Sequence, residues 1–202
     1  MTEAEWLAAT DPEPMLQFLR GSASERKLRL FACGCSLQIG CLGEDGECAV
    51  AVAERFADGL VGESALVAAA ERLNNRPIRD DLTLNFEVMN FGVLAIACLR
   101  TDPVVGTHLT ELLKSTAAVR LLRDIFGNPF HTVIFAPDWR TSTVVALANQ
   151  MYESRDFAPM PVLADALEDA GCDHPDILAH CRDPQPAHVR GCWVVDLILG
   201  KE

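Results

Sequence analysis

Apolar residues recur at helical spacing along nearly the whole chain, and turn-forming residues interrupt them at short intervals. The clearest case is segment 25–42. One apolar stripe there consists of Leu28, Phe31, Cys35, Ile39 and Leu42, and a second consists of Leu30, Cys33, Leu37 and Cys41. A helix with two apolar sides is predicted to be buried on both.

Capping signals divide the rest of the chain into further helices. Thr2 and Glu5 predict a capping box for a first helix, and Asp11 followed by Pro12 begins a second one that ends at Gly21. Periodicity predicts later helices over 48–59, 62–73, 86–99, 103–126, 142–154, 161–170, 175–181 and 189–199. Only 131–137 has the character of an extended segment, and it is too short for a sheet.

This pattern predicts an all-α protein of about ten short helices. We expect residues 1–202 to form one globular domain in which 172–202 is a Cys/His-rich helical hairpin. Composition agrees, because 50% of the residues are hydrophobic and 23% are charged, as is typical of a folded domain.

The charge distribution narrows the choice of partner. The net charge is −12, it is divided evenly between the two halves, and Lys and Arg form no dense cluster. Binding to nucleic-acid phosphates or to an anionic membrane requires such a cluster. We therefore expect neither partner and favour a protein partner, with a basic one the best match.

The compartment expected for the chain determines the chemical state of its cysteines. The first residues lack the basic and apolar regions of an export signal, and the apolar run 86–99 is too short to span a bilayer. A cytoplasmic protein is expected to keep its eight cysteines as thiols or metal ligands.

The stretch CDHPDILAHCRDPQPAHVRGC, residues 172–192, concentrates potential ligands near the end of the chain. The candidates for a zinc site, four of the five being required, are Cys172, His180, Cys181, His188 and Cys192. A helix from Val189 would place His188 and Cys192 on one face, and a turn stiffened by Pro184 and Pro186 would bring the preceding helix opposite.

Two other interpretations of these residues stay open. Free cysteines pack as small apolar residues, and His180 suits a helix C-terminus, so the cluster is also consistent with core packing and no cofactor. A thiol enzyme would pair Cys192 with His188 and use Asp196 to orient the imidazole. Three residues in line on one helix face fit that chemistry poorly, so we assign no catalytic residue.

Several motifs resemble a family of uncharacterised, all-helical proteins from planctomycete bacteria. They include LFAC, LLRDIFGNPF, LADALEDAGC and HVRGCWVVDLILGKE. The resemblance implies no activity or ligand, and the chain departs from it where GCSLQIGC replaces a basic CCRRIW-like run. We expect a non-enzymatic interaction or regulatory module; the alternatives are a structural zinc protein and, more weakly, a Cys–His thiol enzyme.

Overall fold

The computed structural model describes residues 1–38, 43–74, 116–184 and 188–201. It divides into two compact units, Met1–Leu122 and Arg123–Glu202. The expectation of one domain over 1–202 stays a prediction. The predicted helices over 86–99 and in the first part of 103–126 lie outside the described residues.

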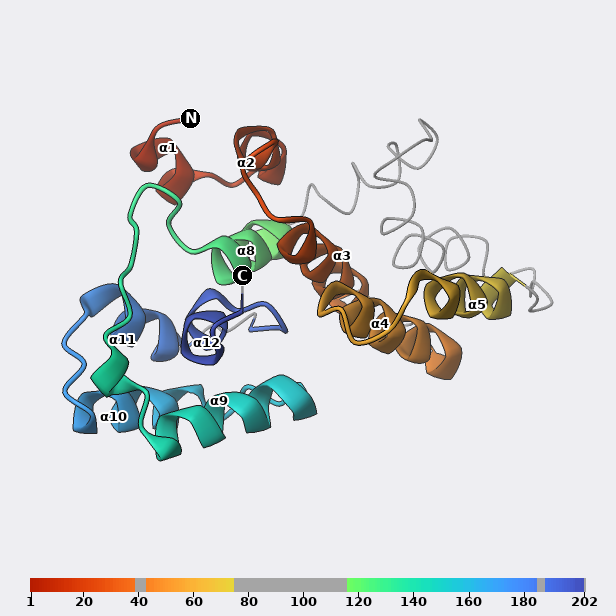
Figure 1. The fold of residues 1–202 in the computed structure, drawn as a ribbon. Coiled ribbons are helices and arrows are strands. Elements are labelled where there is room, and N and C mark those ends of the chain that lie inside the picture. The colour runs from red at the N-terminus through yellow and green to blue at the C-terminus, as the bar shows by residue number, and fades with distance from the viewer. Residues whose placement is uncertain (39–42, 75–115, 185–187, 202) are drawn as a thin grey trace. The chain divides into compact units, whose positions relative to one another are not determined.

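The prediction of an all-α chain with about ten helices is confirmed, and the described residues contain no strand. The first unit contains α1 (Glu3–Ala8), α2 (Pro12–Leu19), α3 (Glu25–Gln38), α4 (Gly43–Ala57), α5 (Glu63–Asn74) and most of α8 (Thr116–Phe126). The second contains the end of α8 and then η1 (Pro137–Trp139), α9 (Ser142–Ser154), α10 (Met160–Asp169), α11 (Pro175–Cys181) and α12 (Trp193–Leu199) (Figure 1).

Local signals place the first helices as predicted. Thr2 and Glu5 exchange the two bonds of a capping box at the start of α1, and the Asp11 side chain accepts from the Glu13 N–H at the start of α2. Both apolar stripes of α3 contribute buried residues, including Phe31 and Cys33. Helix α3 packs against α4, and α4 packs against α5.

Helix α4 begins earlier than predicted. It starts at Gly43, five residues before the predicted start at residue 48, and the segment GEDGE, residues 43–47, forms its first turn. Glu44 and Asp45 lie in that first turn, where carboxylates interact favourably with the positive end of the helix dipole. The dipole explains why an acidic, glycine-containing segment continues as helix.

In the second unit, four helices surround one core. Helix α9 packs against α10 and α12, and α11 packs against α10 and α12, so the contacts close a ring. The core that they share includes Met151, Leu163, Ile177, Cys192 and Ile198. Segment 131–136 forms no regular secondary structure, although Val133 and Phe135 pack against this core.

Helix α12 begins later than predicted. Its first residue is Trp193, four positions after Val189, and Cys192 is its N-cap. The reason is Gly191, which has a φ of +93°, a conformation that an α-helix does not contain. His188 and Cys192 therefore do not share a helix face.

Among the described helices, none has the length and apolarity needed to span a membrane.

Candidate metal centre

Asp124 lies in the last turn of α8, on the side that faces the protein interior. Its neighbours Leu121, Leu122 and Ile125 are fully buried, and Asp124 itself is only 4% exposed. A carboxylate in such surroundings requires polar partners, because an ionised group without them is costly to bury. Asp124 therefore marks a polar site inside an apolar region.

The partners of Asp124 come from the C-terminal segment. His180 occupies the last turn of α11, and His188 and Cys192 lie on either side of the turn that leads into α12. Asp124, His180, His188 and Cys192 each offer a ligand atom, and these four atoms all lie within 4.8 Å of one another. All four residues belong to the second unit.

Four short contacts connect these atoms in a closed ring. Asp124 Oδ1 lies 2.7 Å from His188 Nδ1 and 3.2 Å from His180 Nε2. Cys192 Sγ lies 3.2 Å from His180 Nε2 and 3.9 Å from His188 Nδ1. One nitrogen of each imidazole thus faces both the carboxylate and the thiol.

These spacings are close to those of a tetrahedral zinc site. Zinc bonds of about 2.0–2.2 Å to nitrogen or oxygen and about 2.3 Å to sulfur give ligand–ligand distances of about 3.3–3.6 Å. The four contacts, 2.7, 3.2, 3.2 and 3.9 Å, fall on both sides of that range. Small movements of the side chains would make room for an ion.

Outer contacts hold two of these side chains in place. The Val189 N–H donates to Asp124 Oδ2 at 3.0 Å, so Oδ1 alone is directed at the histidines. The Trp193 ring lies 5.2 Å from the His180 ring, centroid to centroid. Such outer partners orient metal ligands, and their substitution commonly lowers metal affinity.

Gly127 allows Trp193 to occupy that position. The residue has a φ of +61°, and a Cβ atom built on it would lie 3.2 Å from Cγ and Cδ2 of Trp193. Any side chain at residue 127 would therefore strain the backbone and press on the indole. Gly127 therefore both ends α8 and leaves room for Trp193 to pack beside His180.

The carboxylate and the thiol respond differently to burial. Burial opposes the charge of Asp124, but hydrogen bonds from His180 and His188, together with their charges, outweigh it, so the pKa of Asp124 lies below its usual value. Burial raises the pKa of the Cys192 thiol well above its usual value, and the charge of Asp124 raises it further. Hydrogen bonds from the backbone N–H groups of Val195 and Val194 lower this pKa, but by less.

The same geometry argues against a thiol–imidazole relay. In such a relay one ring nitrogen contacts the nucleophile and the other contacts the orienting carboxylate. Here Nδ1 of His188 faces both groups, and its Nε2 is buried without a hydrogen-bond partner among the described residues. Cys192 is also fully buried. Asp196 is buried on α12 and lies outside the group of four ligand atoms.

The structure brings together three of the five residues that the sequence predicts as metal ligands. His180, His188 and Cys192 come together, whereas Cys172 and Cys181 are buried in the same core but lie outside the group. Burial raises the pKa of Cys181 to about 12, as expected for a thiol that packs as an apolar residue. Of the earlier cysteines that the structure describes, Cys33 and Cys35 are buried and Cys48 is exposed.

Asp124 is not among the metal ligands predicted from the sequence, and it lies 56 residues before His180. A signal for it was present, because Asp124 continues the apolar positions of α8, three residues after Leu121 and directly before Ile125. An acidic residue on the apolar face of an amphipathic helix indicates a buried polar partner.

Comparisons with known proteins identify no relative of this chain. No protein-family model, no curated protein and no solved structure matches the chain significantly. The resemblance to the planctomycete family therefore stays a prediction.

Proposed function

We propose that this protein is a structural zinc protein in which Asp124, His180, His188 and Cys192 bind one Zn²⁺. The observation that carries the proposal is the convergence of four ligand atoms within 4.8 Å of one another. They come from α8, from the end of α11 and from the turn before α12, so one ion would connect three parts of the second unit.

The donor set and its charge favour a divalent ion. Imidazole nitrogen, thiolate sulfur and carboxylate oxygen are the ligands that zinc uses in proteins. With neutral histidines, the Asp124 carboxylate and the Cys192 thiolate carry two negative charges, which Zn²⁺ neutralises. A neutral centre is the one that an apolar interior accommodates at the lowest cost.

Burial favours a structural role. The side chains of Asp124 and His188 are 4% and 3% exposed, that of His180 is 17% exposed, and Cys192 is fully buried. Catalytic zinc keeps one position open for water or substrate, whereas a structural site fills all four positions with protein ligands. Four converging protein ligands with little exposure match the structural type, in which metal binding contributes to folding.

Metal analysis of the purified, untagged protein tests this proposal. Elemental mass spectrometry is expected to find about one zinc per chain, and a chelator is expected to remove it and lower the unfolding temperature together. Adding Zn²⁺ back should restore both. A protein without zinc that melts identically with and without chelator would show that the four residues form only a hydrogen-bonded core cluster.

A further inference from the structure

Segment 132–136, with the sequence TVIFA, crosses the surface of the second unit between α8 and η1. Figure 1 shows this part of the chain as a stretched trace without coils. Val133 and Phe135 pack against the core, whereas Ile134 between them is 81% exposed, the highest value among the exposed large apolar residues that the structure describes. This alternation is typical of a β-strand with one face on a core.

Contacts at both ends hold the segment in place. The His131 N–H donates to the Asn128 carbonyl at 3.1 Å, and the Trp139 N–H donates to the Ala136 carbonyl at 3.1 Å. The Phe135 ring also meets the Trp139 ring edge to face, with 5.4 Å between the centroids. A strand that is already ordered loses little conformational entropy when another strand pairs with it.

One edge of this strand has a full set of unused donors. Successive residues of a strand direct their N–H and C=O groups to opposite edges. The odd-numbered edge is bounded by Pro129 and Pro137, which have no N–H. On the even-numbered edge, no hydrogen bond in the described parts of the chain uses the N–H of Thr132, Ile134 or Ala136. An unpaired row of backbone groups is a template for another strand.

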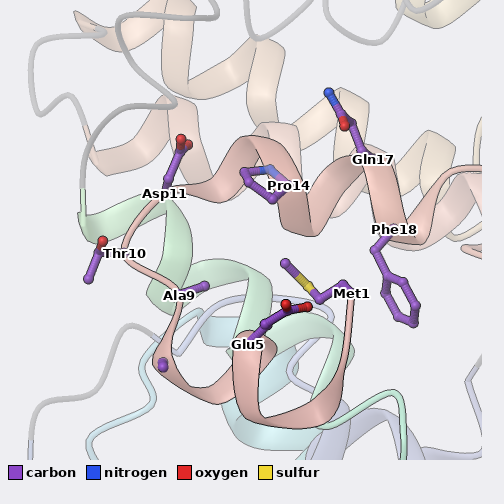
Figure 2. Close-up of a pocket in the computed structure, with 9 residues that line it drawn as sticks. Met1, Glu5, Ala9, Thr10, Asp11, Pro14, Gln17 and Phe18 are labelled. Carbon is purple, nitrogen blue, oxygen red and sulfur yellow. The ribbon is translucent and has the colours of Figure 1, made fainter.

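A depression lined by α1 and α2 in the first unit shows the contrast, because its carboxylates already have partners. Glu5 accepts from the Thr2 N–H and Asp11 accepts from the Glu13 N–H, which are helix-capping bonds. Figure 2 shows the Asp11 carboxylate directed away from Glu5. The main chain of segment 132–136 is the stronger indication of a binding partner.

We propose that the even-numbered edge of segment 132–136 pairs with the same edge of a second copy of this chain, antiparallel and centred on Ile134. Ile134 then lies opposite the partner's Ile134, and Thr132 lies opposite the partner's Ala136. The arrangement has two-fold symmetry, so every contact outside the centre occurs twice. It gives the exposed Ile134 side chain an apolar neighbour and the unused N–H groups their acceptors.

Charge and composition favour a second copy as the occupant. Each chain carries a net charge of −12, so two copies repel and meet at the lowest cost where the surface has no charge. Residues 132–136 contain no charged side chain, and Thr, Val, Ile and Phe all favour strands. The same register places Asp138 opposite the partner's Phe130, so no like charges face each other beside the strand. A basic partner would be attracted to carboxylates, which this segment lacks.

The length of the segment limits the strength of the dimer. Prolines at 129 and 137 bound the paired region, and the register gives about six hydrogen bonds. A ribbon of two short strands is only marginally stable without support, and here the support is the core beneath Val133 and Phe135. We therefore expect a weak dimer that forms as the protein concentration rises.

Two substitutions of Ile134 separate strand pairing from other contacts. Ile134→Lys places two positive charges opposite each other at the centre. Ile134→Pro keeps an apolar side chain but removes the N–H, and the residue before a proline prefers the extended backbone that Val133 needs here. Val162→Lys is the matched control, because Val162 is 56% exposed on α10 of the same unit and the change in net charge is identical. Circular dichroism melts check that each variant folds like the parent.

Sedimentation velocity of the full chain over rising concentration measures the dimer, with a reducing agent present because Cys48 is exposed. We expect the parent and Val162→Lys to dimerise equally, and both Ile134 variants to do so with affinity about tenfold lower. In a mixture of labelled and unlabelled protein, isotope-filtered NMR should detect contacts between copies at residues 132–136.

Four results would overturn the proposal. The first is a parent that stays monomeric up to its solubility limit, and the second is a dimer whose contacts between copies lie outside residues 132–136. The third is dimerisation that Ile134→Lys leaves unchanged. The fourth is undiminished dimerisation of Ile134→Pro, which would show that side-chain contact, and not main-chain pairing, joins the copies.

Discussion

His188 Nδ1 lies 2.7 Å from Asp124 Oδ1, although 64 residues separate them in the chain. Cys192 and His180 approach the same two atoms, so a carboxylate, a thiol and two imidazoles share one small volume. Charged and polar groups are seldom buried together without a ligand or a complete hydrogen-bond network. A metal centre and a hydrogen-bond network respond differently to zinc and to substitution of these residues.

Cys192→Ala should abolish zinc-dependent stability, whereas Cys181→Ala should not. Both thiols are buried in the same core, so each truncation should cost the metal-free protein a similar amount, about 1 kcal/mol. Zinc at 100 times its Kd should stabilise the parent and Cys181→Ala by about 2.7 kcal/mol. Denaturant titrations with and without zinc measure this difference, and an equal response from Cys192→Ala would remove that residue from the ligand set.

Asp124→Asn should weaken zinc binding while keeping the shape of the side chain. Substitutions of outer-shell partners alone cost about 10- to 100-fold in metal affinity, so loss of a ligand charge should cost at least as much. Asp165→Asn is the control, because Asp165 is exposed and pairs with Arg182 in the same unit. Competition with a chromophoric chelator gives both affinities; an unchanged value for Asp124→Asn would contradict the proposed coordination.

Gly127→Ala should destabilise the second unit more than Gly171→Ala. Both glycines have positive φ, 61° and 84°, so both substitutions strain the backbone by about 1–2 kcal/mol. Only at Gly127 would the new methyl group press on Trp193, since nothing lies within 4 Å of a Cβ at Gly171. The added loss at residue 127 should appear in both unfolding free energy and zinc affinity. Equal effects of the two variants would show that the Trp193 contact is unimportant.

Arg190→Ala should lower the free energy of unfolding by about 2–4 kcal/mol, because it removes the arginine donor of a buried carbonyl and a cation–π contact. Arg190 Nε donates to the Tyr152 carbonyl at 2.6 Å, and its guanidinium lies 4.8 Å from the centre of the Tyr152 ring. Arg182→Ala is the comparison: its pairs with Glu168 and Asp165 are exposed, so the unfolding free energy should barely change. Similar losses from both variants would contradict this account of the core.

Local chemistry explains which parts of the fold could be predicted from sequence. Thr2, Glu5 and Asp11 fix the first two helix starts through bonds to residues two or three positions away. The start of α12 was predicted wrongly because Gly191 looks compatible with a helix until its positive φ is known. A glycine inside an apolar period is an ambiguous signal.

The candidate site was only partly predictable. His180, His188 and Cys192 are close in sequence, so their spacing attracts attention. Asp124 joins them only because the end of α8 lies near the turn before α12, where the Val189 N–H donates to Asp124 and Gly127 approaches Trp193. Neither that packing nor the choice of Cys192 over Cys181 follows from spacing, since both depend on where each side chain points after folding.

Zinc K-edge X-ray absorption on the purified protein tests the central claim most directly, because it counts ligand atoms at the ion. The account predicts one sulfur at about 2.3 Å and three nitrogen or oxygen atoms at about 2.0–2.2 Å. Two or more sulfurs would place Cys181 or Cys172 at the metal in place of Asp124 or a histidine. Such a spectrum, or a protein that binds no zinc at all, would contradict the centre described here.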